Sequence, residues 1–259
     1  MDPPLRKFIF HDLQAIEGYI DPPDALVFLS LLRSQASAGL GGAVAEIGVY
    51  YGRSYFLFRR ICGAQEKIVA IDSFEIGEAG DIAQYERFVE NGRRLGLPVQ
   101  EDLVIRSDST LLKPSDIEGK AGPVRFFSVD GGHMLYHVAS DSQLAANSLA
   151  DHGIIAFDDT FNPAWPEVTV GVADFLRAEK GAFSVFCITK YKTYVCRQSF
   201  HAFYSEAVAT SLDLRAFSHV ETEFLGSKAT RLENPMRRRI VHELLVRAGM
   251  SAFSERAYR

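Results

Sequence analysis

The amino-acid sequence predicts an α/β protein built on a doubly wound, mostly parallel sheet of seven strands that closes with a C-terminal antiparallel hairpin. The chain has 259 residues, of which 47% are hydrophobic and 24% charged, so it can bury a large core. From residue 43 onward, apolar runs of strand length alternate with helical patterns, which requires right-handed crossovers and a parallel sheet covered on both faces. Two final apolar runs are joined by a Lys-Tyr-Lys turn, which is the pattern of a hairpin.

The chain divides into three predicted parts. Residues 1–40 form an N-terminal helical segment, because apolar residues recur at helical spacing over 24–37 after a Pro-Pro-Asp start. Residues 41–198 form the main domain, and residues 199–259 form an extension that packs on it and ends in a helix over 234–249. Within the main domain the predicted strands are 43–49, 67–74, 101–109, 124–130 and 153–160, the predicted helices are 50–62, 82–97, 136–150 and 168–181, and the predicted hairpin is 183–198.

Charge and composition exclude several classes of protein. With 28 Lys and Arg against 33 Asp and Glu, the formal net charge is -5, which argues against a nucleic-acid partner because such proteins present a strongly basic face. No apolar run approaches the ~20 residues needed to cross a bilayer, and the N-terminus lacks the apolar region of a signal peptide. We therefore expect a cytoplasmic protein with no membrane partner. Cys62, Cys187 and Cys196 have no metal-ligand spacing, and the last two are expected as buried thiols.

Acidic residues lie in or directly after all five predicted parallel strands. Ligands of open parallel sheets bind outside the carboxyl ends of the strands, so these residues mark one predicted site. The first strand carries Glu46 and leads into a loop with Gly48 and Gly52, where a ligand can approach the backbone closely, followed by Ser54. Burial of an unpartnered Glu46 is unfavourable, and the alternative is that backbone amides bind it within tight strand-to-helix packing.

The second and third strands end in Asp72-Ser73 and in Asp108 with its flanking serines. Asp72 lies about twenty residues beyond the glycine loop, where nucleotide-binding folds place the acid that accepts hydrogen bonds from ribose hydroxyls. We expect Asp108 to face the adenine end of the same ligand. The alternatives are a helix N-cap for Asp72 and an ordinary turn residue for Asp108.

Four segments, AEIGVYYGRS, AIDSFE, VDGGH and AFDDTF, follow one another at these strand ends. In this order and spacing they resemble the class I S-adenosylmethionine-dependent methyltransferases, and among them the metal-dependent O-methyltransferases related to macrocin O-methyltransferase. The resemblance covers roughly residues 12–198 and implies a Rossmann-like sheet, the strand order 3-2-1-4-5, and S-adenosylmethionine as the cofactor. It implies that Glu46 and Asp72 hold the cofactor, and the cofactor pocket is predicted to include Gly48, Gly52, Ser54, Ser73, Asp108 and Asp130.

Three aspartates, Asp130, Asp158 and Asp159, follow two strands that this order makes neighbours. Three like charges at one place are unfavourable unless a cation or protons neutralise them, and oxygen ligands suit Mg²⁺. We therefore predict a Mg²⁺ site. Adjacent side chains on a strand point to opposite faces, so Asp158 and Asp159 can converge only where the strand breaks into a loop. The alternative is that one binds metal while the other caps or forms a salt bridge.

His133 lies three positions after Asp130, where the related enzymes place a catalytic base; some of them use Lys or Asp instead. An imidazole accepts a proton near neutral pH, so His133 is the predicted general base. The alternatives are a transition-metal pair with His137 and a plain surface histidine. In the loop after the aspartates, Phe161 and Trp165 predict either an aromatic wall over the acceptor or ordinary packing.

Together these patterns predict Mg²⁺-dependent transfer of a methyl group from S-adenosylmethionine to a hydroxyl of a small-molecule or glycan acceptor, such as a sugar or a glycosylated metabolite. One alternative is a nucleotide-dependent oxidoreductase, although the first loop lacks the G-x-G-x-x-G pattern. The other is a non-catalytic relative that binds a nucleoside. Apolar N-terminal helices, where exposed, would favour a homodimer.

Overall fold

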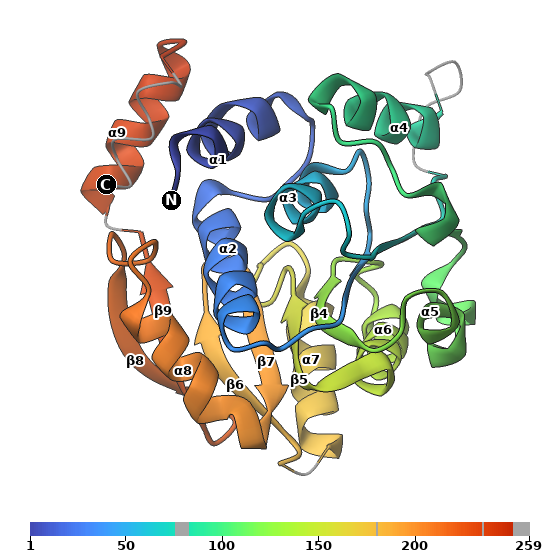
Figure 1. Ribbon diagram of the computed structural model, residues 1–259. Helices are drawn as coiled ribbons and strands as arrows, with labels where there is room; N and C mark the ends of the chain where they lie inside the picture. The colour runs from blue at the N-terminus through green and yellow to red at the C-terminus, as the bar shows by residue number, and fades with distance from the viewer. Residues whose placement is uncertain (76–82, 180, 235, 251–259) are drawn as a thin grey trace.

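The computed structural model describes residues 1–75, 83–179, 181–234 and 236–250. Figure 1 shows a layered arrangement of helices around one twisted sheet. The helices are α1 (Pro3–Lys7), α2 (Pro22–Ser37), α3 (Arg53–Cys62), α4 (Gln84–Leu95), α5 (Pro114–Ala121), α6 (Leu135–Ser148), α7 (Pro166–Ala178), α8 (His201–Thr210) and α9 (Met236–Arg247). The strands are β1 (Ala43–Ile47), β2 (Ile68–Asp72), β3 (Val104–Arg106), β4 (Val124–Val129), β5 (Leu149–Phe157), β6 (Phe183–Ile188), β7 (Thr193–Arg197), β8 (Ser218–Phe224) and β9 (Ser227–Glu233).

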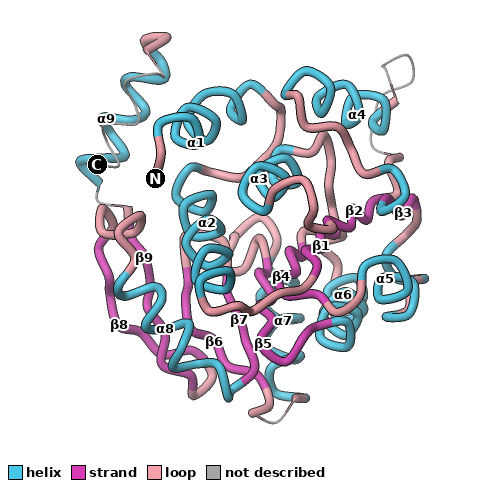
Figure 2. Tube along the Cα trace, in the orientation of Figure 1, coloured by secondary structure: helices cyan, strands magenta, loops and turns pink. Residues whose placement is uncertain are grey.

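The strands of the described chain form one sheet in the order β3-β2-β1-β4-β5-β7-β6-β9-β8 (Figure 2). Strands β1 to β5 pair in parallel, and β7 pairs antiparallel with both β5 and β6. The predicted α/β class, the parallel sheet and the closing hairpin are thus confirmed. The sheet is longer than the predicted seven strands, because the extension contributes a second hairpin, β8–β9, whose β9 pairs in parallel with β6.

Helices cover both faces of the sheet because each face is apolar. One face packs against α2, α3 and α8, where Phe28 stacks on Phe58 with ring centroids 5.1 Å apart and meets Phe126 of β4 edge-on at 5.0 Å. The other face packs against α5, α6 and α7 through residues such as Val138 and Val172. Figure 1 shows α2, α3 and α8 on one side of the sheet and α6 and α7 on the other. Strands covered on both sides account for their nearly continuous apolar sequences.

The N-terminal segment packs onto this core. Leu5, Phe8, Ile9 and Leu13 of α1 and the turns after it are buried in the same apolar cluster as α2 and α3. These apolar side chains are therefore not exposed, and the reason for expecting a homodimer through them does not hold; a homodimer stays a prediction. Asp2 caps α1 by accepting a hydrogen bond from the Leu5 amide at 2.8 Å.

Two predicted boundaries differ from the structure. The helix predicted over 136–150 ends at Ser148, and β5 begins at once with Leu149, which pairs with Val124 of β4. The third strand is only three residues long, because residues 101–103 form a 3₁₀ turn. Cys187 and Cys196 are buried free thiols, as predicted.

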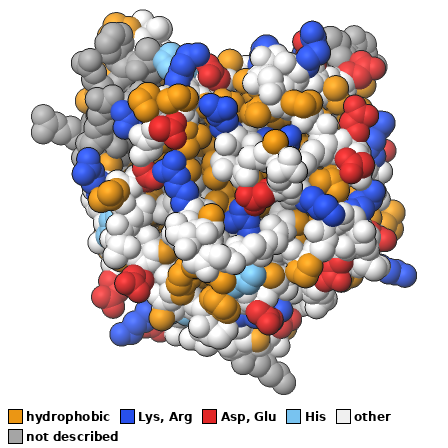
Figure 3. Space-filling model, viewed as in Figure 1, with side chains coloured by type: hydrophobic (Ala, Val, Ile, Leu, Met, Phe, Trp, Pro, Cys, Tyr) orange, Lys and Arg blue, Asp and Glu red, His pale blue; other side chains and the backbone are white. Residues whose placement is uncertain are grey.

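The surface in view in Figure 3 has acidic and basic side chains interspersed, with apolar side chains between them. Within the described ranges, no helix combines the length and the apolar character that a membrane span requires.

Candidate functional site

The carboxyl ends of β1, β4 and β5 meet at one edge of the sheet. The Asp130 amide donates to the Ile47 carbonyl at 2.9 Å, and the Asp158 amide donates to the Val129 carbonyl at 2.9 Å, so the parallel ladder continues one residue beyond each strand. Both aspartates are therefore held at the same level, side by side. This follows from the strand order, because neighbouring parallel strands end at the same edge.

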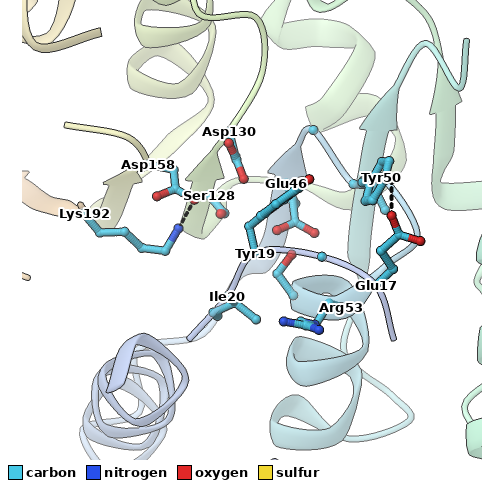
Figure 4. Close-up of a pocket in the computed structure, with 14 residues that line it drawn as sticks. Glu17, Tyr19, Ile20, Glu46, Tyr50, Arg53, Ser128, Asp130, Asp158 and Lys192 are labelled. Carbon is cyan, nitrogen blue, oxygen red and sulfur yellow. Dashed lines mark hydrogen bonds and ion pairs between the residues drawn. The ribbon is translucent and has the colours of Figure 1, made fainter. Parts of the chain in front are cut away.

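A small cavity opens at this edge (Figure 4). Glu46, Ser54, Ser128, Asp130 and Asp158 contribute to its wall. Residues 17–20 of the N-terminal segment lie across it, held in part by the Tyr50 hydroxyl, which donates to Glu17 at 3.0 Å. The cavity volume is about 30 Å³, which is room for about two water molecules. A ligand of nucleoside size would therefore require neighbouring segments to move.

Glu46 is the most deeply buried acid of this cavity, at 1% exposure. Burial raises the pKa of Glu46 to about 8, although the hydroxyls of Ser54 and Ser128 act against that rise. No hydrogen bond to its Oε2 atom is formed by the described residues. The predicted alternative, a Glu46 held by backbone amides, is not what the structure has, and a ligand with hydrogen-bond donors or positive charge would satisfy this carboxyl group.

The two glycines of the first loop have different roles. Gly48 lines the cavity with φ of 82°, and a Cβ there would lie 1.7 Å from the Asp130 carbonyl oxygen. Gly52 is the N-cap of α3 with φ of 89°, and a Cβ there would meet the rings of Phe56 and Phe88. Gly48 thus permits the contact between the β1 and β4 loops, whereas Gly52 permits packing and does not line the cavity.

Asp72 organises the loop after β1. It accepts hydrogen bonds from the amides of Tyr50 at 2.8 Å and Phe74 at 2.7 Å. These bonds hold Tyr50, whose φ is 51°, in the left-handed region. Asp72 and the exposed Ser73 do not line the cavity, so their predicted contact with the cofactor stays a prediction.

Asp108 is exposed and caps the turn that follows it. It accepts hydrogen bonds from the amide and the hydroxyl of Thr110 at 2.9 and 2.8 Å, which lower the pKa of Asp108. This is the turn role given as the alternative for Asp108. Asp108 is not among the residues that line the cavity, so its predicted contact with adenine stays a prediction.

The backbone leaves the extended conformation of β5 at the two aspartates that follow it, where the sequence predicts that the strand breaks into a loop. Asp159 has φ of 54°, so its side chain points toward His133, with Oδ2 3.0 Å from His133 Nε2. Ligand atoms of Asp130, His133 and Asp159 all lie within 4.8 Å of one another. His133 and Asn162 hold the pKa of Asp159 low against the effect of burial. These three side chains could hold a cation.

Asp158 has a different partner. Its Oδ2 forms an ion pair with the ammonium of Lys192, which comes from the turn between β6 and β7 (Figure 4). Burial and the adjacent Asp158 charge raise the pKa of Asp130 well above its usual value. The arrangement matches the predicted alternative in which one of the two aspartates after β5 forms a salt bridge.

His133 is half-buried and stacks on Trp165, with ring centroids 4.3 Å apart and an angle of 11° between the rings. His133 precedes α6, so its spacing to His137 is not that of two ligands on one helix face, and His137 is outside the group that could hold a cation. Trp165 is 44% exposed and Phe161 42%. The ring of Phe161 packs edge-on against that of Phe224 in β8, with centroids 5.2 Å apart, so the C-terminal hairpin lies on this side of the site.

Sequence reasoning missed Lys192, Ser128 and residues 17–20. The sequence does contain a signal for Lys192. Strand β7 runs antiparallel to β5, so the turn between β6 and β7 lies at the edge of the sheet where β4 and β5 end. The Lys-Tyr-Lys turn therefore lies at the predicted site. Residues 17–20 have no comparable signal, because their position depends on contacts between distant side chains.

Residues 45–160 match a protein family described as methyltransferase domain. Among solved structures, the O-methyltransferase NovP is similar with a TM-score of 0.58 and 17% identity, over 69% of this chain and 81% of that one. CalS11, a TDP-rhamnose 3'-O-methyltransferase in calicheamicin biosynthesis, has a TM-score of 0.53 and 17% identity, over 75% and 91%.

The O-methyltransferase from Bacillus cereus, solved in complex with SAH, has a TM-score of 0.51 and 17% identity, over 75% of this chain and 90% of that one. At these identities the likeness shows a shared fold. No curated protein matches the chain.

Proposed function

We propose that this protein methylates, from S-adenosylmethionine, a hydroxyl group of a sugar or of a glycosylated small molecule, because residues 45–160 match a family described as methyltransferase domain. Two similar folds belong to an O-methyltransferase and to a TDP-rhamnose 3'-O-methyltransferase, which favours this acceptor class. The exposed aromatic side chain of Trp165, which stacks on His133, suits the apolar face of a sugar ring, and Phe161 of the same loop is also exposed.

One observation carries the proposal: Asp130 and Asp158 line both the cavity that contains Glu46 and a second, smaller cavity that contains His133. In this proposal the cofactor binds in the cavity with Glu46 and the base lies in the cavity with His133, and Asp130 and Asp158 are shared by the two. A methyl donor on the Glu46 side and an acceptor hydroxyl on the His133 side would meet beside that wall. Both cavities are small, so binding requires residues 17–20 or the loop with Trp165 to move.

The cofactor suits the charge of the Glu46 cavity. Its acidic lining includes Glu17, Glu46, Asp130 and Asp158, against the basic Arg53 and Lys192. S-adenosylmethionine carries a sulfonium and an ammonium group, and such charges stabilise ionised carboxylates nearby. Glu46, which has an oxygen without a partner, is the side chain that this cofactor would satisfy.

His133 is the proposed general base. It would accept the proton of the acceptor hydroxyl as the oxygen forms a bond to the methyl carbon and the carbon–sulfur bond breaks, which leaves S-adenosylhomocysteine and a methyl ether. The stack with Trp165 fixes the plane of the imidazole ring. The Asp159 carboxylate at 3.0 Å would stabilise the imidazolium that forms.

A divalent ion fits the chemistry of this site. Mg²⁺ binds to proteins through one or two carboxylates and completes its shell with water or substrate oxygens. Asp130 and Asp159, with ligand atoms within 4.8 Å of each other and of His133, would hold it. When bound, the ion would make a neighbouring hydroxyl more acidic. The third predicted ligand, Asp158, is engaged by Lys192.

The test is methyl transfer to a panel of nucleotide-activated sugars and glycosylated aromatic compounds, followed as release of S-adenosylhomocysteine and a gain of one methyl group in mass. His133→Asn should lower kcat by about 10²–10⁴-fold and leave the Kd for S-adenosylhomocysteine within about twofold. His137→Asn is the matched control and should keep the wild-type rate. Absence of cofactor binding, or full turnover by His133→Asn, would contradict the proposal.

A further inference from the structure

Lys192 brings a positive charge into the carboxylate cluster by way of the β6–β7 turn. Thr193 pairs with Phe157 in the antiparallel β5–β7 ladder, so the residue before Thr193 lies beside the residue after Phe157. The Thr189 amide donates to the Lys192 carbonyl at 2.9 Å, and the Lys192 amide donates to Thr189 Oγ1 at 3.2 Å. The sheet and the turn together fix where the Lys192 side chain begins.

The Lys192 side chain is buried, at 4% exposure, and its ammonium pairs with Asp158. The ammonium also lies 5.9 Å from the centre of the Phe28 ring. Burial alone would lower the pKa of Lys192, but Asp158, Asp130 and Asp24 outweigh burial and raise that pKa above its usual value. The side chain is a cation held inside the site.

The Asp158 carboxylate has both oxygens engaged. Oδ2 meets Lys192, and Oδ1 accepts a hydrogen bond from the Asp159 amide at 2.8 Å. The group that could hold a cation accordingly consists of Asp130, His133 and Asp159 and does not include Asp158. A fixed ammonium beside these carboxylates repels a second cation, and the repulsion is strong where little water screens it.

We propose that Lys192 is a tethered counter-cation that holds Asp158 out of the divalent-ion site and weakens ion binding by its neighbours. The inference deepens the proposed function and rests on it, because it concerns the ion beside His133. It has two consequences that do not depend on turnover. The carboxylate cluster is stable without a divalent ion, and removal of the ammonium makes the fold depend on one.

Titration of the protein with Mn²⁺ by calorimetry tests the first step. Lys192→Met keeps the length of the side chain and removes the charge, whereas Lys190→Met removes an exposed lysine of the same turn and serves as the control. Lys192→Met should bind Mn²⁺ about tenfold or more tightly than the wild type, because the variant lacks the ammonium that repels the ion. Lys190→Met should stay within about twofold.

Thermal unfolding in EDTA and in Mn²⁺ tests the second consequence. Without metal, Lys192→Met should have a lower Tm than the wild type, because Asp158 loses its counter-charge. Mn²⁺ should raise the Tm of this variant more than that of the wild type. If the methionine variant does not fold, Lys192→Gln takes its place, because glutamine can still donate a hydrogen bond to Asp158. It should also bind Mn²⁺ more tightly than the wild type and have a lower Tm without metal.

Equal, weaker or undetectable Mn²⁺ binding by the Lys192 variants would overturn the inference. Binding of S-adenosylhomocysteine is measured on the same samples. Its absence in every variant would contradict the methyltransferase proposal, whereas the Mn²⁺ titration decides the role of Lys192 whatever that result is. The two failures can therefore be told apart.

Discussion

The raised pKa of Glu46 predicts that cofactor affinity depends on pH. With a pKa of about 8 in the free protein, about 1% of Glu46 is ionised at pH 6 and about 9% at pH 7. A ligand whose ammonium group needs the ionised carboxylate binds only that fraction. The affinity for S-adenosylhomocysteine should therefore rise about tenfold from pH 6 to pH 7, which is about 1.4 kcal/mol.

Calorimetry at pH 6.0, 6.5, 7.0 and 7.5 measures this slope, and buffers of different ionisation enthalpy count the proton that is released. Glu46→Gln removes the titrating group in a side chain of the same shape and should bind weakly with little change over this range. A wild-type Kd that changes less than twofold, or an equal slope in Glu46→Gln, would refute the reasoning.

The same shift has a consequence for stability. A folded-state pKa above the unfolded value of 4.5 contributes stability that is complete below pH 4.5 and is lost as the pH rises toward 8. We therefore expect the difference in free energy of unfolding, Glu46→Gln minus wild type, measured in urea without cofactor, to increase between pH 4.5 and pH 8 by at most about 1.4 kcal/mol per pH unit. If the stability of the variant minus that of the wild type stays constant or falls as the pH rises, burial does not control this carboxyl group.

Three further predictions concern other parts of the structure. Gly48→Ala should lower the free energy of unfolding by more than the cost of placing an alanine in the left-handed region, which is about 1–2 kcal/mol, because its Cβ would meet the Asp130 carbonyl. Gly63→Ala, at a φ of 87° and with open space around the Cβ, is the control, and equal losses of the two variants in urea unfolding would contradict this reasoning. Trp165→Ala should lower kcat/KM for the acceptor and leave the Kd of S-adenosylhomocysteine unchanged, and a loss of cofactor binding would count against the assignment of Trp165 to the acceptor side. Phe28→Ala should cost about 3–5 kcal/mol in urea unfolding, since the ring is fully buried between Phe58 and Phe126, and a cost below about 1 kcal/mol would show that the core can close over the gap.

Much of the fold could be predicted from the sequence because its signals are local. Apolar runs such as residues 43–49 and 124–130 have the length of strands, and the helical patterns between them leave a parallel sheet as the simple solution. The meeting of Asp130 and Asp158 then follows from the order of the strands. The positive φ of Asp159 is the break that lets its side chain turn toward His133.

Other parts of the site depend on contacts that a sequence pattern does not contain. Asp72 and Asp108 lie at the predicted strand ends, but nearby amides of Tyr50, Phe74 and Thr110 compete for their oxygens. Lys192 is adjacent in space to Asp158 although 34 positions separate them in the chain. The β8–β9 hairpin has few apolar residues, so its strands are weakly marked, and only the pairing of β9 with β6 places it in the sheet.

The β8–β9 hairpin changes which strand forms the free edge of the sheet. All six residues of β6 are buried, and without β9 its backbone amides and carbonyls would form a free apolar edge, which invites aggregation by strand addition. The sheet ends instead at β8, whose outward residues include His219, Glu221 and Glu223. Charged side chains along an outer strand discourage a second chain from adding to it. A truncation before β8 would thus remove the charged outer strand and leave β6 as a free apolar edge to which a second chain could add.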